Sequence, residues 1–335
     1  MDLYSTIEPR HMTLDVLLSD DKATDTDPIA AAFDRNDVLI EARTAHDPDE
    51  LREAAAGVDA LIVDASTPVT ADVLAALDDL RVVGRAGIGF DNIDVRAADE
   101  HDVVVVNVPD YCIEEVSTHA FALLLACLRR LGSYDRAIRR GEWDWTVGRP
   151  IERLAGSTVG LFAFGKIARR FAAKLRGFDV DVVAHDPYVS AYRMADMGVE
   201  AVDFEGLLSR SDVLSVHAPL TDETRGTFDA SAFEQLRDGA IFVNTARGPI
   251  VDEDALLAAL EAGTVDSAGL DVRETEPPGD SPLHDREGVV LSPHVAWYSE
   301  QSQIDLGATV ARDVDRVLDG EPPRNRVDPE WDWLS

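Results

Sequence analysis

Short apolar runs alternate with amphipathic stretches along most of the chain, and this alternation constrains the fold more than any other feature. The runs are rich in Val, Leu and Ile and are apolar on both faces, which is typical of strands buried in a parallel sheet. Segments with helical periodicity, such as 70–77, separate them. The expected strands of a first set lie at 14–19, 37–40, 59–63, 81–84 and 102–107, and those of a second set lie at 157–164, 179–186, 212–217, 239–244, 266–272 and 288–293. The pattern predicts an α/β fold with two doubly wound parallel sheets.

A break in the pattern separates the two sets and indicates a domain boundary. Residues 108–110 form this break, and an apolar-striped helix is expected after it over 113–131, with Gly132 at its end. The stripe fits packing in a core or against a second subunit equally well. A last helix is expected near 299–319, and residues 1–12 show no clear period and are expected to form an extension. A length of 335 residues agrees with about two domains.

The composition is strongly acidic. The formal net charge is −33, from 64 Asp and Glu against 31 Lys and Arg, and the acidic residues are spread along the chain rather than gathered in a tail. Such a surface repels phosphate backbones, which argues against nucleic-acid binding by the surface at large. Concentrated salt screens self-repulsion, so we interpret the composition as a halophilic adaptation and expect stability to fall as salt is removed.

The sequence also argues against membrane and metal partners. No apolar run reaches the length of about 18 residues that a membrane span needs, and the first residues do not resemble a charged-then-apolar signal segment. Cys112 and Cys127 match no zinc or redox spacing. We expect both to be small buried side chains in a reducing compartment, and we therefore expect a cytoplasmic protein.

The segment AFGKIA, residues 163–168, follows an expected strand and opens a helix, as a dinucleotide-binding turn does. Gly165 holds the middle glycine position of that motif, where a side chain would block the pyrophosphate, and Ala168 holds the third. Ala163 replaces the first glycine. Because alanine disfavours positive φ, we expect a less demanding turn there. The residues expected to face the phosphates are Phe164, Gly165, Lys166 and Ile167.

An acidic residue at the end of the next expected strand supports this interpretation. Asp186 lies 21 residues after Gly165, where a carboxylate can bind both ribose hydroxyls of the adenosine. The same carboxylate would repel a 2′-phosphate, so the sequence favours NAD over NADP. The alternative role for Asp186 is to cap a turn or helix before Pro187.

Three charged or titratable side chains follow later strands of the second set: Arg247, Glu276 and His294. Because the carboxyl ends of parallel strands share one edge of a sheet, we expect these side chains to converge beside the dinucleotide. An imidazole can exchange a proton with a carbonyl oxygen near neutral pH, a carboxylate can stabilise the imidazolium, and a guanidinium can bind a substrate carboxylate. Each residue alone also fits a packing, capping or surface role.

Taken together, these motifs resemble the D-isomer-specific 2-hydroxyacid dehydrogenases from about residue 13 onward. The segments that carry the resemblance are GRAGIGFDNID (84–94), VPDYCIEEVSTHAFALLL (108–125), FGKIARR (164–170), VVAHDPY (182–188), VHAPLTDETRG (216–226), VNTARGPIVDEDAL (243–256), LDVRETEPP (270–278) and SPHVAWYSEQS (292–302). Within the family, the chain looks most like the branch that contains the C-terminal-binding proteins and phosphoglycerate dehydrogenase-like enzymes.

The resemblance implies a Rossmann-type NAD-binding domain over 110–295, inserted in a flavodoxin-like substrate domain built from 13–109 plus 296–335. It implies Arg247, Glu276 and His294 as the catalytic trio, and a homodimer formed through helix 113–131. Further cofactor contacts that it implies are His217, Ala218, Pro219, Thr224, Thr245, Ala246, Asp271 and His294 itself. Substrate contacts that it implies are Arg85, Ala86, Gly87, Ile88, Arg247 and Trp297.

The function expected from these observations is NAD-dependent, reversible reduction of a 2-oxo acid to a D-2-hydroxy acid, with His294 as the acid–base group. One alternative is 3-phosphoglycerate dehydrogenase, which is disfavoured because the loop 63–70 lacks the basic residue often found in that branch. Trp297 hints at an apolar or thioether substrate tail, or else packs at the domain hinge. A second alternative is an NAD(H)-sensing interaction protein, which would bind NADH without appreciable turnover.

Overall fold

The computed structural model describes residues 13–19, 26–33, 35, 37–45 and 47–330. The chain divides into two compact units. Unit 1 is formed by residues 1–111 and 300–334, and unit 2 by residues 112–299, so the second unit is inserted in the first. The expected extension 1–12 lies outside the described residues.

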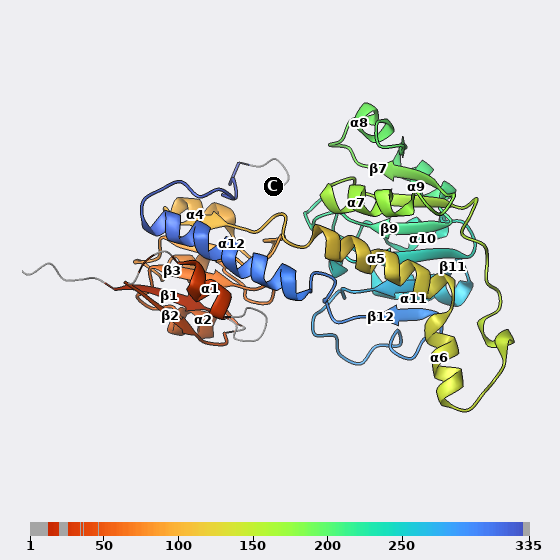
Figure 1. Cartoon of the computed structure of the whole chain (residues 1–335), viewed down its shortest axis with the longest axis horizontal. Coiled ribbons are helices and arrows are strands. Elements are labelled where there is room, and N and C mark those ends of the chain that lie inside the picture. Colours follow the sequence, from red (N-terminus) through yellow and green to blue (C-terminus); the bar gives the residue numbers. More distant parts are fainter. Residues whose placement is uncertain (1–12, 20–25, 34, 36, 46, 331–335) are drawn as a thin grey trace, which may run out of the picture. The chain divides into compact units, whose positions relative to one another are not determined.

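Unit 1 contains a five-stranded parallel sheet in the order β2-β1-β3-β4-β5, with helices around it (Figure 1). This strand order is that of flavodoxin-like folds, and it confirms the predicted class. The strands are β1 (Leu14–Leu18), β2 (Val38–Ala42), β3 (Ala60–Val63), β4 (Val82–Arg85) and β5 (Val104–Val106). The helices are α1 (Thr26–Ala32), α2 (Pro48–Ala54), α3 (Ala71–Leu74), α4 (Val95–Glu100) and α12 (Glu300–Leu318).

Local sequence signals explain where these helices begin and how one of them packs. Asp47, Thr70 and Asp94 precede α2, α3 and α4, and each side chain accepts a backbone N–H from the first turn of its helix. Helix α12 packs against β4 and α1. Gly84 on β4 permits this packing, since a Cβ there would lie 2.8 Å from side-chain atoms of Val310 and Val314.

Unit 2 contains a seven-stranded parallel sheet in the order β12-β11-β10-β9-β6-β7-β8. The order reverses between β6 and β9, which is the Rossmann arrangement with one further strand, as predicted. The strands are β6 (Thr158–Phe162), β7 (Asp181–His185), β8 (Glu200–Ala201), β9 (Val213–Val216), β10 (Ala240–Asn244), β11 (Val265–Leu270) and β12 (Val289–Leu291). The helices are α5 (Ile113–Leu128), α6 (Leu131–Arg139), η1 (Trp145–Gly148), α7 (Lys166–Leu175), α8 (Ala191–Ala195), α9 (Phe204–Arg210), α10 (Ala230–Glu234), η2 (Gly248–Ile250) and α11 (Glu253–Ala262).

The helix expected over 113–131 is present as α5 but ends three residues earlier than expected, and a second helix, α6, begins at Leu131. Helix α5 ends at Leu128, and Arg130 adopts a left-handed conformation with φ 54° before α6 begins at Leu131. The Arg130 guanidinium forms an ion pair with Asp266 at the start of β11, which fixes the corner. Gly132 therefore lies inside α6 and does not end the helix.

Both cysteines are buried, as expected, and neither forms a disulfide bond. Burial raises the pKa of the Cys127 thiol to about 12, so this side chain is an unreactive part of the core. Among the described residues, no helix combines the length and the apolar character that crossing a membrane requires.

Candidate active site

Arg247, Glu276 and His294 follow β10, β11 and β12, three neighbouring strands of unit 2. Glu276 and His294 are in direct contact, with 2.6 Å between the carboxylate Oε2 and the imidazole Nδ1. Because a carboxylate only accepts, Nδ1 carries the proton and donates it, which leaves Nε2 as the ring nitrogen turned away from the glutamate. The structure thus brings together two of the predicted residues as a hydrogen-bonded pair of a carboxylate and an imidazole.

The charge state of Glu276 follows from opposing effects. Burial raises the pKa of its carboxyl group, but the hydrogen bond and charge of His294 outweigh burial, with help from the Arg273 backbone N–H and the charge of Arg247. The net result is a pKa below the usual value, so Glu276 is ionised near neutral pH. The charge of Arg247 is the last and smallest of these contributions to the pKa of Glu276.

Asp271, one residue beyond β11, anchors the turn that carries His294. Its backbone carbonyl accepts the His294 N–H at 2.7 Å, and its carboxylate accepts the backbone N–H groups of Val295 at 3.0 Å and Ala296 at 2.9 Å. The side chain is 1 % exposed and also accepts the Ser292 hydroxyl at 2.6 Å. Asp271 therefore fixes the backbone of His294, which has a φ of 52°.

Two further side chains support the same turn. The Trp297 indole N–H donates to the His294 carbonyl at 3.0 Å, so the tryptophan stabilises the backbone of the histidine on its C-terminal side. On helix α5, His119 Nε2 lies 2.8 Å from the Ser292 hydroxyl and 3.5 Å from Asp271. Sequence reasoning missed His119 and Ser292, since neither belongs to a pattern that predicts chemistry.

Arg247 lies just before η2 and has an extended backbone conformation. Its Nη1 donates to the Ala246 carbonyl at 2.9 Å. The next residue, Gly248, lies against the backbone of the loop after β11, and a Cβ there would overlap the Arg273 carbonyl group. Only glycine permits this approach. This close contact holds the loop that carries Arg247 against the loop after β11, which carries Glu276.

The turn between β6 and α7 fits an anionic ligand such as a pyrophosphate. Gly165 is the N-cap residue of α7, and no side chain caps this helix. A Cβ on Gly165 would meet no atom within 4 Å, so the space beside the turn is open. The positive end of the α7 dipole and its first N–H groups face this space, where Phe164, Lys166 and Ile167 complete the turn.

The expectation of a less demanding turn at Ala163 is wrong. Ala163 has a φ of 72°, which is the left-handed conformation that the motif's first glycine adopts without cost. Its backbone N–H donates to the His185 carbonyl at 2.8 Å, and this bond to β7 holds the residue in place. The turn keeps its geometry and stores strain at the alanine.

Asp186 lies directly after β7 and contacts this turn. Its Oδ2 accepts the Phe164 backbone N–H at 2.7 Å, and its Oδ1 accepts the Tyr188 N–H at 2.8 Å. The carboxylate is thus held beside the turn at the place where the sequence predicts a ribose ligand. The alternative, a turn cap before Pro187, describes the Tyr188 contact but not the contact to Phe164.

His217 and Thr245 follow β9 and β10 at equivalent positions, since Val216 pairs with Asn244 in the sheet. His217 Nδ1 and Thr245 Oγ1 are buried and have no hydrogen-bond partner among the described residues. Two unpartnered polar atoms at this edge fit a bound ligand that supplies their partners. Burial lowers the pKa of His217 to about 3, so its ring is neutral near pH 7.

The remaining predicted cofactor residues lie in the same unit. Ala218 is buried and Pro219 is exposed beyond β9, and the Thr224 hydroxyl donates to the Pro219 carbonyl at 2.7 Å. Ala246 donates its N–H to the Asn244 side chain at 3.0 Å, which shapes the corner before Arg247.

Arg85, Ala86, Gly87 and Ile88 follow β4 and belong to unit 1. Arg85 is 5 % exposed, and its guanidinium lies over Gly87, where a Cβ would overlap it. The loop is fixed by backbone and side-chain bonds, including Val108 N–H to the Gly87 carbonyl at 2.9 Å and Asn107 Nδ2 to the Ile88 carbonyl at 2.7 Å. The sheet edge of unit 1 thus presents a buried arginine on a rigid loop.

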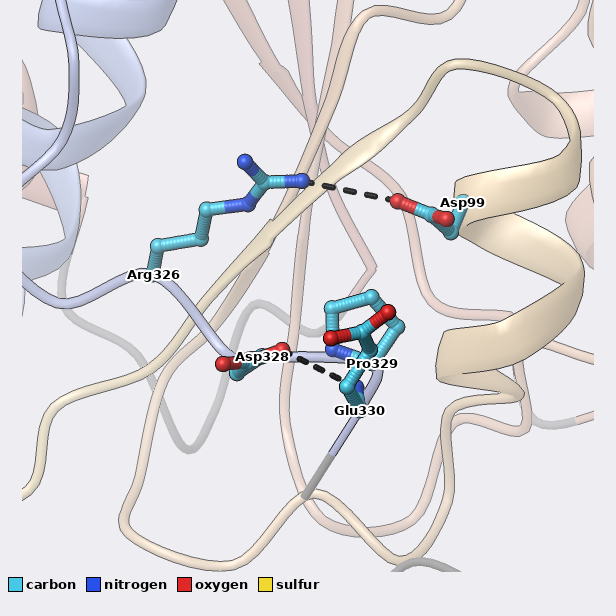
Figure 2. A pocket seen from close by; sticks show the side chains of 5 residues that line it. All are labelled: Asp99, Arg326, Asp328, Pro329 and Glu330. Carbon is cyan, nitrogen blue, oxygen red and sulfur yellow. Dashed lines mark hydrogen bonds and ion pairs between the residues drawn. The ribbon is translucent and has the colours of Figure 1, made fainter.

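A shallow hollow on unit 1 is lined by Asp99, Arg326, Asp328, Pro329 and Glu330 (Figure 2). Arg326 and Asp99 form an ion pair at 3.4 Å, and the Asp328 side chain accepts the Glu330 N–H at 2.9 Å. None of the predicted site residues lines this hollow. Among the described residues, no group of three or more His, Cys, Asp or Glu is arranged to hold a metal ion.

Residues 121–296 match the NAD binding domain of the D-isomer specific 2-hydroxyacid dehydrogenases. The chain belongs to this family. It is 40% identical over 294 residues to D-3-phosphoglycerate dehydrogenase of Archaeoglobus fulgidus, covering 88% of this chain and 56% of that protein. It is 42% identical over 308 residues to the Mycobacterium leprae protein of the same name, covering 91% and 57%.

The chain is also similar to a solved structure of a dehydrogenase that acts, by its name, on a D-2-hydroxy acid. The holo form of Rhodotorula graminis D-mandelate dehydrogenase matches with a TM-score of 0.83 and 30% identity, over 94% of this chain and 97% of that one. The chain spans little more than half the length of the two phosphoglycerate dehydrogenases. The family's NAD-binding domain lies within unit 2, which carries Glu276 and His294.

Proposed function

We propose that the protein is an NAD-dependent dehydrogenase that interconverts a D-2-hydroxy acid and a 2-oxo acid, with His294 as the acid–base group. The observation that carries this proposal is the 2.6 Å contact between Glu276 and His294 at the carboxyl edge of the family's NAD-binding domain. Such a pair supplies a proton donor whose charged form is stabilised by its neighbour.

In this proposal, NAD supplies the group that accepts or returns a hydride, and the chain's own residues handle the proton and the carboxylate. His294 uses Nε2 to take the hydroxyl proton in one direction and to donate it to the carbonyl oxygen in the other. Glu276 holds the ring through Nδ1 and stabilises the imidazolium. Arg247 binds the substrate carboxylate through its planar guanidinium.

The residues present fit NAD, and the fit rests on the open space at Gly165, the uncapped N-terminus of α7 and the position of Asp186. A 2′-phosphate placed near Asp186 would meet a carboxylate, which favours NAD over NADP. Asp271 and the edge residues His217 and Thr245 are the candidates for contacts with the rest of the cofactor.

We propose 3-phosphoglycerate as the first substrate to test, because two phosphoglycerate dehydrogenases are 40% and 42% identical to this chain over 88% and 91% of its length. On the substrate side, Arg85 at the end of β4 is a candidate partner for an anionic group. This choice replaces the unphosphorylated acid that the sequence alone favours.

An unphosphorylated 2-hydroxy acid is the second candidate, and a specific observation favours it. The loop after β3 carries Asp64, whose Oδ1 accepts the backbone N–H groups of Ser66 and Thr67 at 3.0 Å each. Val63 and Arg85 are register partners, so this carboxylate follows the strand beside β4. An acidic group there opposes a phosphate dianion.

The test is NADH oxidation with phosphohydroxypyruvate and a panel of unphosphorylated 2-oxo acids in high salt. A kcat/KM for phosphohydroxypyruvate at least tenfold above every other acid supports phosphoglycerate chemistry. The reverse ranking supports the second candidate. NADH binding with no turnover of any 2-oxo acid would instead support the NAD(H)-sensing alternative and overturn the proposed function.

We also propose that the protein is a cytoplasmic homodimer, and we place the interface on the segment 129–153, named the arm, rather than on one helix over 113–131. The arm exposes Leu131 by 56%, Ile138 by 50%, Trp143 by 92% and Trp145 by 70%. It contains seven Arg against four Asp and Glu, whereas the chain as a whole has a net charge of −33. A basic, aromatic arm therefore complements the acidic surface of a second copy.

A further inference from the structure

Arg273 is a buried charged residue that the proposed chemistry does not use. It is 6 % exposed and lies two residues beyond Asp271. Its guanidinium makes two parallel bonds to the Glu253 carboxylate, from Nε to Oε1 at 2.8 Å and from Nη2 to Oε2 at 2.7 Å. Glu253 is the first residue of α11, where a carboxylate also benefits from the helix dipole.

The same guanidinium closes the loop 273–284. Nη2 donates to the Ser281 hydroxyl at 3.0 Å, and Nη1 lies 3.1 Å from His284 Nε2. A guanidinium only donates, so this histidine nitrogen is the acceptor. The Glu274 backbone N–H adds a bond to Glu253 Oε1 at 2.8 Å. The 273–274 end of the loop is therefore attached to the start of α11, and the 281–284 end is attached to Arg273.

The backbone of Arg273 reaches the acid–base pair. Its N–H donates to Glu276 Oε1 at 2.9 Å, while the other carboxylate oxygen of Glu276 holds His294. Its carbonyl lies against Gly248, the neighbour of Arg247, so closely that no Cβ fits between them. Arg273 is thus attached to α11 by its side chain and to Glu276 by its backbone.

We propose that the Arg273–Glu253 ion pair is a positioning device that holds Glu276 in the geometry that His294 requires. This inference rests on the proposed function for the role of His294. A buried ion pair contributes little net stability compared with apolar residues, but it strongly disfavours loop conformations that separate its charges. The pair therefore acts on the reaction through the conformation of the loop.

Few groups near His294 could transmit this effect. Glu276 contacts the ring itself, Asp271 binds the backbone N–H groups beside it, and His119 reaches the turn through Ser292. Arg247 acts through its charge on Glu276. Of these groups, Glu276 is the one that accepts a bond from Arg273.

The test follows the ring titration of His294 by NMR in the cofactor-free protein, which has eight histidines, with the signal assigned by His294→Gln. Arg273→Met is expected to lower the midpoint, because a displaced Glu276 carboxylate favours the imidazolium less. In a Glu276→Gln background the same change is expected to have no further effect, because the two residues act in one chain of contacts.

Arg210→Met is the matched control, since Arg210 makes an equally close double contact with Glu200, at 2.7 Å for both bonds, on the exposed surface of unit 2. It is expected to leave the His294 midpoint unchanged. Arg273→Lys keeps the charge but loses the second donor, so an intermediate shift is expected. In turnover, Arg273→Met is expected to lower kcat about tenfold with NADH affinity unchanged.

An unchanged His294 midpoint in folded Arg273→Met would overturn the proposal, and so would a shift that persists in the Glu276→Gln background. If Arg273→Met does not fold, Glu253→Gln and Arg273→Lys give the same two readouts with smaller changes in volume. A wild-type protein that turns over no 2-oxo acid would defeat the proposed function alone, because the NMR titration needs no substrate.

Discussion

The Glu276–His294 contact at 2.6 Å makes a direct prediction at the residue scale. In the proposed mechanism, reduction of a 2-oxo acid needs protonated His294, so its rate is expected to fall as pH rises. Glu276→Gln removes the charge that favours the imidazolium, and this fall is then expected at lower pH, with kcat reduced by about 10²-fold. Profiles of kcat/KM against pH for both proteins measure the shift, and coincident profiles would contradict the role given to Glu276.

Glu276 also links stability to pH. Its folded-state pKa is below the usual value, so its contribution to stability is present above the unfolded-state pKa. That contribution is lost as pH falls through the folded value, that is, on the acid side of the usual glutamate range. Urea unfolding at several acid pH values is expected to show a smaller loss for Glu276→Gln than for the wild type.

The φ of 72° at Ala163 predicts an effect on stability, because this conformation is energetically less favourable for alanine than for glycine. Ala163→Gly is expected to raise the free energy of unfolding by about 1 kcal/mol, measured by urea denaturation. Ala168→Gly is the matched control in the same motif. It removes a buried methyl group inside helix α7 and is expected to destabilise. A loss of stability in Ala163→Gly would contradict the strain.

Single residues differ in how well the sequence predicts them. Glu276 and His294 could be found because each follows a buried strand, and parallel strands deliver such residues to one edge. The conformation of Ala163 could not, since propensity alone favours relaxation of the turn, whereas the bond to His185 and the register of β6 and β7 enforce it. Arg273 gave no signal because its partner lies 20 residues earlier on another element.

At the scale of elements, most strands were predicted well, whereas the end of one helix and the short strand β8 were not. Buried parallel strands have a strong apolar signature, but β8 has only two residues and shows no apolar run in the sequence. The apolar spacing continues from α5 past Leu128 to Leu131, so periodicity alone extends the helix across the corner. The break depends on Arg130 and its pairing with Asp266, a contact between residues far apart in sequence.

The exposed aromatic side chains of the arm allow a test of the proposed dimer interface. Removing the exposed indoles with Trp143→Ser and Trp145→Ser together is expected to convert a dimer into a monomer, measured by sedimentation velocity in high salt. Tyr192→Ser is the matched control, because Tyr192 is an aromatic side chain that is 83% exposed on α8. A wild-type protein that is monomeric, or a double variant that stays dimeric, would rule out this interface.

At the scale of the whole molecule, the two strand orders match the predicted fold class because chain pattern and connection rules leave few arrangements of alternating strands and helices. The roles expected for the two units in binding substrate and cofactor come from the family resemblance, not from the pattern of strands and helices. The identity of the substrate could not be obtained from either, since Arg85 and Asp64 favour opposite answers.

The net charge of −33 predicts a dependence of stability on salt. Lowering salt from about 1 M to about 0.1 M lengthens the screening distance from about 3 to about 10 Å, so more like charges repel one another. The Tm is expected to fall by roughly 5–10 °C, which corresponds to about 2–3 kcal/mol for a domain of this size. A Tm that does not change between these conditions, followed by circular dichroism, would remove the halophilic interpretation.

In the proposed function, His294 is oriented by Glu276 and moves the proton, while the rest of unit 2 binds the dinucleotide. The most direct measurement compares His294→Gln with the wild type, using turnover of the best 2-oxo acid and NADH binding by fluorescence titration. If His294 moves the proton, kcat is expected to fall by about 10³-fold while the Kd for NADH stays within about twofold. Wild-type turnover in this variant would contradict that role of His294.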